Sequence, residues 1–120
     1  MLGVTTQPST RRVFSLNQAR ELLPEVKALT AAAVRRVEAL ASRLQQVQET
    51  DATYGQLESS IEEAVTEWTR ALHAMGLETK GLWLVDFDNG EGYYCWCYPE
   101  DSVAHFHEYD GGFAGRMKIV

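Results

Sequence analysis

The sequence predicts an α+β fold in which a long helical hairpin precedes a small antiparallel sheet. Up to Met75, apolar residues recur every three or four positions, as on one face of an α-helix. After Gly81 they alternate, as in half-buried strands. The Asn89-Gly90 pair then supplies the residues that a tight β-hairpin turn favours. These observations predict a helical hairpin over residues 15–76 and a β-meander of three or four strands over residues 81–120.

The helical part is expected to begin with a capped helix. Ser15 and Gln18 have the spacing of a capping box, so the first helix should start near Leu16. Pro24 lacks an amide donor and disfavours helical geometry in the residue before it. It also suits the first turn of a new helix. We therefore expect a short helix, a kink, and a long helix over residues 24–48.

Two apolar seams of coiled-coil type predict that the long helix pairs with a second one. The seams cover residues 26–47 and 57–75, and Gly76 suits a left-handed cap. The polar residues 49–55 should join the two helices as an antiparallel hairpin. Because such helices are longer than typical strands, the hairpin should overhang the sheet and leave apolar surface exposed. We therefore expect a homodimer joined through the helices.

The strand part is expected to contain strands over residues 82–87, 93–98 and 103–109, with a last short strand over residues 117–120. Glycines between residues 111 and 115 allow a compact bend before the last strand. Several aromatic side chains share one face of these strands and suggest core or a concave lining. They are Trp83, Tyr94, Trp96 and Tyr98.

Composition limits the class of protein. A chain of 120 residues suits one domain, here residues 13–120, preceded by a loose arm over residues 1–12. A net charge of -6 and a pI near 5.0 argue against nucleic-acid binding. No apolar run of about 18 residues predicts a membrane span. Cys95 and Cys97 stand two apart in a strand, at the limit of disulfide geometry, so we expect reduced thiols and a cytoplasmic protein.

Several segments together resemble one known family. They are Phe14-Ser15-Leu16, Leu22-Leu23-Pro24-Glu25-Val26, Lys80-Gly81-Leu82, Val85-Asp86-Phe87, Cys95-Trp96, His107 and Gly112-Phe113-Ala114-Gly115-Arg116. The chain is similar from Phe14 onward to the bacterial family named domain of unknown function 2203, whose activity is not agreed. The family pattern usually has a basic residue at Cys97, an aromatic at His105 and tryptophan at Phe106. A function shared across the family therefore cannot depend on Cys97 or His105.

A polar set at positions that match the family forms one candidate site. The set contains Asp86, Glu100, His107 and Arg116, with Trp96 beside it. His107 could carry a proton while Asp86 orients its ring, and Arg116 could bind a carboxylate or phosphate. The structural alternative is that Asp86 caps a turn, His107 bonds a neighbouring strand, and Arg116 pairs with Glu100 or Asp110.

A metal site is a second candidate. Cys95, Cys97, His105 and His107 form pairs at strand spacing and could supply four zinc ligands. The strand register decides this, and two registers stay open. If Cys95 faces Phe106, the histidines lie on the other face, whereas a shift of one residue puts Cys95 beside His105. Because such short pairs are weak signals, we expect buried thiols rather than bound zinc, and no cofactor.

These observations favour a non-enzymatic interaction or scaffold protein. Its helices would bind a second copy or an unknown protein partner, and the aromatic sheet face would offer a second contact. No nucleophile completes the polar set, so we expect no enzymatic activity. The alternative is a small-ligand or metal site at the strand ends around Asp86, His107 and Arg116, with weak acid/base chemistry.

Overall fold

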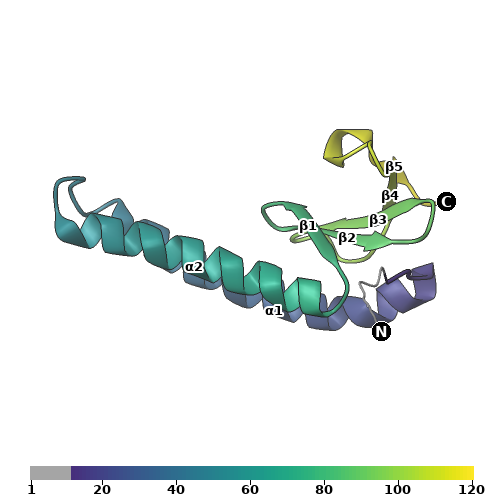
Figure 1. Ribbon diagram of the computed structural model, residues 1–120, viewed down its shortest axis with the longest axis horizontal. Helices are drawn as coiled ribbons and strands as arrows, with labels where there is room; N and C mark the ends of the chain where they lie inside the picture. The colour runs from purple at the N-terminus through teal and green to yellow at the C-terminus, as the bar shows by residue number, and fades with distance from the viewer. Residues whose placement is uncertain (1–11) are drawn as a thin grey trace, which may run out of the picture.

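The structure, a computed structural model, describes residues 12–120 as two α-helices followed by a five-stranded antiparallel sheet (Figure 1). This confirms the predicted α+β class and the order of helices before strands. The two helices lie side by side against one face of the sheet and extend well beyond it (Figure 1).

Helix α1 spans Leu16–Leu44 and begins where the capping box predicts. The amide of Gln18 donates to Ser15 Oγ at 3.1 Å, and the amide of Ser15 donates to Gln18 Oε1 at 2.8 Å. Pro24 lies inside this helix, so the predicted division into two helices is wrong. Leu23 and Val26 flank Pro24 and are buried in the core, and their packing offsets the lost backbone hydrogen bond. The first turns of α1 tilt away from the axis of the rest (Figure 1).

Helix α2 spans Ala52–Ala74 and is joined to α1 by residues 45–51. Its N-cap is Asp51, whose carboxylate accepts from the amide of Thr53 at 2.9 Å. This cap starts the helix ahead of Gly55, which the sequence pattern had placed in the connection. At the other end, Gly76 has a φ of 85°, which confirms the predicted left-handed cap.

The strands β1 (Glu78–Gly81), β2 (Leu84–Asp88), β3 (Gly92–Cys97), β4 (His105–Glu108) and β5 (Met117–Lys118) pair in sequence order as an antiparallel meander. Strand β1 is an addition to the predicted meander. Leu82 and Trp83 form a turn between β1 and β2, so residues 82–87 are not one strand. Trp83 has a φ of 64° there, and its ring packs edge-on against Trp68 of α2 with centroids 4.9 Å apart. This contact between helix and turn interrupts the alternation.

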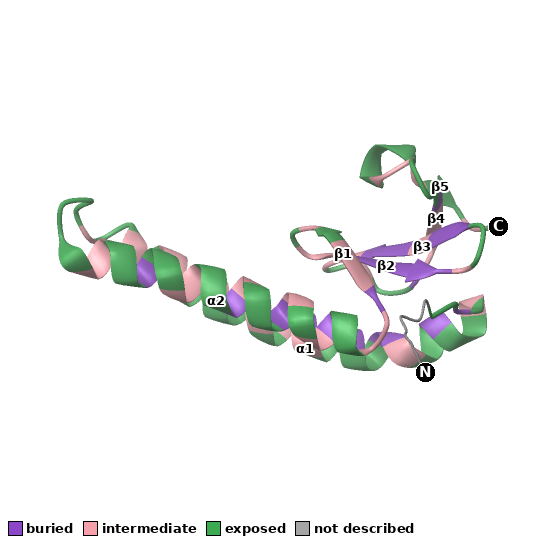
Figure 2. Cartoon of the chain, viewed as in Figure 1, coloured by how far each residue is buried: buried purple, intermediate pink, exposed green. Residues whose placement is uncertain are grey.

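The core lies between the helices and one face of the sheet (Figure 2). Val85, Phe87 and Trp96 supply the sheet side, and all three are fully buried. Phe14 joins the start of α1 to the sheet, because its ring packs edge-on against Phe87 and its amide donates to the carbonyl of Asp88 at 2.7 Å. The core therefore takes up the apolar face of the sheet and leaves the other face for polar side chains.

Two further expectations concern the ends of the chain and membranes. The predicted arm over residues 1–12 lies outside the described residues, apart from Arg12. Arg12 Nη1 donates to the carbonyl of Met75 at 2.8 Å, so this residue is held against the end of α2. Within residues 12–120, neither helix has an apolar stretch long enough to cross a lipid bilayer.

One buried hydrogen bond between the helices yields a stability prediction. Trp68 Nε1 donates to Thr30 Oγ1 at 2.9 Å. In Thr30→Val, the indole N–H stays buried without this acceptor, so we expect the free energy of unfolding to fall by about 1–3 kcal/mol. Urea unfolding followed by tryptophan fluorescence measures the change. Thr66→Val, at an exposed position of α2, is the control and should change little. Equal stability of the two variants would contradict the role of Thr30.

Candidate functional site

The polar residues predicted from the sequence gather on the sheet face turned away from the helices. Cys95 pairs with Asp86 on one side and with His105 on the other, which is one of the two registers left open by the sequence. Directly opposite residues in antiparallel strands share a face, so His107, two positions after His105, lies on the same side. Asp86, Cys95 and His107 are 4%, 1% and 1% exposed. They are buried although the helices lie on the other side of the sheet.

The segment that covers this face runs from β4 to β5 and includes the short 3₁₀ turn η2 (Phe113–Gly115) (Figure 1). Tyr109 donates its hydroxyl to Asp88 Oδ1 at 2.7 Å. Arg116, at the other end of the segment, contacts the ring of His105. The segment is thus fastened at both ends to side chains of the polar face.

Asp86 and His107 form the centre of the site. His107 Nε2 lies 3.0 Å from Asp86 Oδ1, and His107 Nδ1 lies 2.7 Å from the carbonyl oxygen of Glu108. If the imidazole ring carries only one N–H, its other nitrogen has no hydrogen to donate to the acceptor oxygen that it faces. The geometry is satisfied when the ring carries two protons, or when Asp86 holds a proton and donates it to Nε2. In both cases a shared proton lies between two buried side chains.

Aromatic rings close the site beside His107. The ring of Tyr93 lies 5.4 Å from that of His107 and 5.1 Å from that of Tyr109. Lys80 Nζ lies 3.5 Å from the centroid of the Tyr93 ring, and the Tyr93 hydroxyl donates to Glu78 Oε2 at 3.1 Å. The sequence reasoning missed Tyr93. Its position two residues before Cys95 in an alternating strand was the signal that could have placed it on this face.

A second polar group surrounds Arg116. Its Nη2 donates to both carboxylate oxygens of Glu100, at 2.8 and 2.7 Å, and lies 2.6 Å from His105 Nδ1. Glu100 is itself held by the amide of Cys97, which donates to Glu100 Oε1 at 2.9 Å. Among residues 12–120, Arg116 Nε is a buried donor without a hydrogen-bond partner. The structure therefore brings together Glu100 and Arg116, next to the Asp86–His107 pair.

Three of the predicted site residues do not join the central pair. Trp96 lies on the opposite face, in the core, where its Nε1 donates to the carbonyl of Glu100 at 2.8 Å. The Cys97 thiol faces the carbonyl of Tyr98 at 3.5 Å, and the His105 ring contacts Arg116. In the described part of the chain, the group with metal-ligating geometry instead contains Asp86, Cys95 and His107, whose ligand atoms all lie within 4.8 Å of one another.

The environment of the two thiols keeps them protonated. Burial, together with the nearby carboxylate of Asp86, raises the pKa of the Cys95 thiol from 9.0 to about 12. Burial also raises the pKa of Cys97, and the charge of Glu100 acts in the same direction. Because the thiolate is the reactive form, neither cysteine is an activated nucleophile at neutral pH.

Comparison with known families identifies the chain's family. The model of the family described as "Uncharacterized conserved protein (DUF2203)" matches residues 12–119. The chain belongs to this family, as the sequence resemblance implied. No curated protein and no solved structure matched the chain.

The raised pKa values predict slow alkylation of the folded protein. At pH 8, a thiol with a pKa of about 12 is ionised in about one molecule in ten thousand. With a chelator present to keep the thiols free of metal, we therefore expect iodoacetamide to label Cys95 much more slowly than Cys97, with a rate that rises about tenfold per pH unit. Mass spectrometry of Cys97→Ser and Cys95→Ser, each with one thiol left, measures the two rates. Labelling in denaturant is the control, and equal rates in the folded proteins would contradict the prediction.

Proposed function

We propose that this member of the DUF2203 family is a non-enzymatic cytoplasmic scaffold protein that forms a homodimer through its helical hairpin. The proposal depends on the part of the hairpin that extends past the sheet. There the apolar residues of both helices remain partly exposed, and the two helices carry opposite charge.

The apolar seam of the hairpin is incompletely covered. Helix α1 has 29 residues and is about 43 Å long, whereas the six residues of β3 extend about 20 Å. Val34 is the last buried residue of α1. The later seam positions Val37, Leu40 and Leu44 are half-buried. In a helical bundle such positions face other helices and are buried, so a second hairpin would complete this core.

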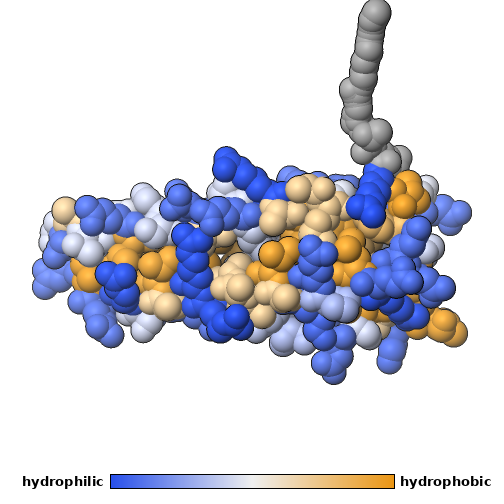
Figure 3. Space-filling view, turned by 90° about the horizontal axis from the view of Figure 1, so that it is seen from below, coloured by the Kyte–Doolittle hydropathy of each residue, from blue (hydrophilic) through white to orange (hydrophobic). Residues whose placement is uncertain are grey.

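A groove on the hairpin lies on the side turned away from the sheet. The sheet-facing side of α1 is identified by Arg20 and Lys27, which donate to the carbonyls of Val103 and Asp101. The groove lies on the other side, between the two helices, and has a volume of about 200 Å³. Its lining residues are Leu29, Ala32, Ala33, Arg36, Ala64, Glu67, Trp68 and Ala71. Figure 3 shows apolar side chains gathered along the middle of this face.

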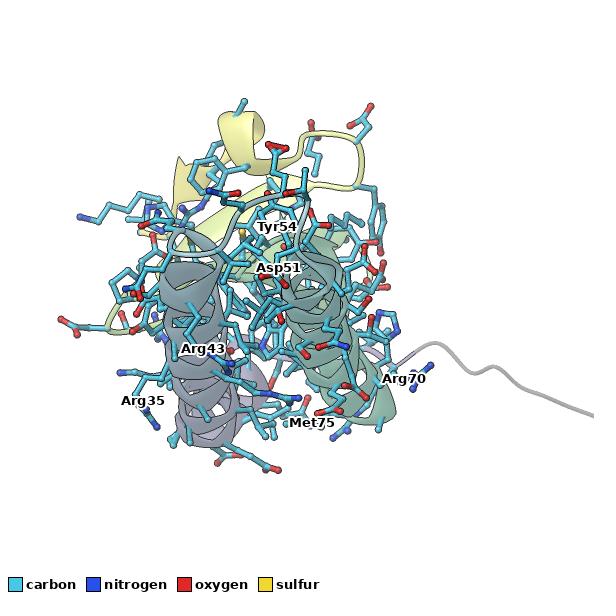
Figure 4. All side chains as sticks on the ribbon, turned by 90° about the vertical axis from the view of Figure 1, so that its left-hand side faces the viewer. Arg35, Arg43, Asp51, Tyr54, Arg70 and Met75 are labelled. Atoms are coloured by element: carbon cyan, nitrogen blue, oxygen red, sulfur yellow. The ribbon has the colours of Figure 1, made fainter. Side chains whose placement is uncertain are left out.

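Charge complementarity favours a second copy as the occupant. Beyond Val34, α1 carries Arg35, Arg36 and Arg43 against one acidic residue, Glu38, as Figure 4 shows in part. Helix α2 is predominantly acidic. Its charged residues are Glu58, Glu62, Glu63, Glu67 and Arg70. A copy whose α1 lies over this α2 meets opposite charge, whereas α1 over α1 brings like charges together.

This pairing defines the symmetry of the dimer. A two-fold axis parallel to the hairpin places each α1 over the α2 of the other protomer and antiparallel to it. Both connecting loops then lie at the same end of a four-helix bundle, and both sheets lie on its outer faces. Arg36 and Glu67 lie level along the hairpin, because Arg36 Nη1 donates to Glu67 Oε1 at 2.8 Å. Each arginine can therefore also reach the other protomer's glutamate.

Sedimentation equilibrium over a range of concentrations tests the dimer. We expect twice the chain mass of 13.5 kDa for the wild-type protein. Ala33→Glu puts a charge into the proposed interface and should weaken association at least about tenfold, because a buried charge without a partner is costly. Ser42→Glu is the control at an exposed position of α1 that does not line the groove, and it should still dimerise. A wild-type monomer at all concentrations would overturn the proposal.

Charge reversal tests the arrangement of the helices. Arg36→Glu should weaken the dimer when α1 lies over α2, because it places two acidic residues together. Adding Glu67→Arg should restore association. If α1 instead lay over α1, Arg36→Glu would exchange one like-charged pair for another, because both protomers carry the change, and the dissociation constant would change little. A clear rise in the dissociation constant at low salt that shrinks at high salt therefore supports α1 over α2, whereas an unchanged constant supports α1 over α1.

A further inference from the structure

We propose that Asp86, Cys95 and His107 bind a zinc ion on the buried polar face of the sheet. The three residues come from adjacent strands, β2, β3 and β4, and their positions are fixed by the ladder of strand pairing. This face is separated from the proposed dimer interface by the sheet and both helices (Figure 1). The zinc site therefore does not depend on dimerisation.

The donor set fits zinc in kind and in distance. Carboxylate oxygen, cysteine sulfur and histidine nitrogen are all zinc ligands, whereas Ca²⁺ and Mg²⁺ prefer oxygen ligands. Tetrahedral bonds of about 2.0–2.3 Å place ligand atoms roughly 3.3–3.8 Å apart. The three atoms already lie within 4.8 Å of one another, so side-chain shifts of about 1 Å would complete the coordination. Water would take the fourth position.

The orientation of His107 supports this reading independently. A metal-binding histidine commonly donates its second N–H to a carbonyl or carboxylate, which fixes the ring and directs the other nitrogen at the ion. His107 Nδ1 faces the carbonyl of Glu108 at 2.7 Å, and Nε2 points at Asp86. A zinc ion between Nε2 and the carboxylate would replace the proton that these two acceptors otherwise have to share.

Charge balance also favours a divalent ion. The Asp86 carboxylate and a Cys95 thiolate carry two negative charges, which one Zn²⁺ neutralises in the buried site. On binding, the sulfur–zinc bond forms, the thiol proton of Cys95 and the proton held between His107 Nε2 and Asp86 leave to the solvent, and no electron is transferred.

The first experiment uses the full chain without a histidine tag. Elemental analysis after purification without chelators should find about one zinc per chain. After removal of the metal with a chelator, titration with Co²⁺ alone should produce the near-ultraviolet charge-transfer band of a thiolate–cobalt bond. Absence of both the zinc and the band would overturn the proposal.

Matched variants then identify the ligands. We expect Cys95→Ser to remove the cobalt band and His107→Gln to weaken zinc binding at least about 100-fold. Cys97→Ser and His105→Gln are the controls. Cys97 lies two residues after Cys95, and His105 lies two residues before His107, so both are on the polar face of the sheet. Circular dichroism checks that each variant is folded. If Cys97→Ser or His105→Gln removes binding as completely, the ligand set proposed here is wrong. The wild-type cobalt band remains decisive if a site variant fails to fold.

Discussion

The register between β2, β3 and β4 is the constraint on which both faces of the sheet depend. Asp86, Cys95 and His105 stand opposite one another, so Val85, Phe87 and Trp96 turn toward the helices. A slip of β3 by one residue would put the Cys95 thiol into the core and turn Trp96 toward the polar face. Burial of Trp96 and Phe87 opposes such a slip, and so does the turn, where Asn89 Oδ1 accepts from the amides of Glu91 and Gly92 at 2.8 Å each.

The elements that could be predicted from the sequence are those whose causes lie within a few residues. The capping box at Ser15, the cap at Gly76 and the Asn89-Gly90 turn are all local, and all are present. The helix through Pro24 was missed because distant packing of its neighbours outweighs the local preference. Strand β1 was missed for a similar reason. The turn that separates β1 from β2 is stabilised by the contact of Trp83 with the distant residue Trp68.

The candidate site shows the same division. Alternation along a strand predicts which residues of that strand share a face with Asp86, Cys95 or His107. It does not predict how neighbouring strands align. The Asp86–His107 and Glu100–Arg116 pairs could therefore be suggested from residue chemistry, whereas the grouping of Cys95 with Asp86 required the register. Trp96 shows the same limit. Its aromatic face could be core or a concave lining, and the structure places Trp96 in the core, with its neighbours in the chain turned the other way.

The composition of the polar face is difficult to explain by stability alone. A buried ion pair often contributes no more than apolar residues of similar volume, because both charges lose their hydration. Leucine or valine at Asp86 and His107 would extend the core without that penalty. The face instead holds a carboxylate, an imidazole and a thiol within reach of one another, closed by the segment that links β4 to β5. Burying a carboxylate and a thiolate costs free energy unless a positive charge compensates them. A bound divalent cation would supply that positive charge here.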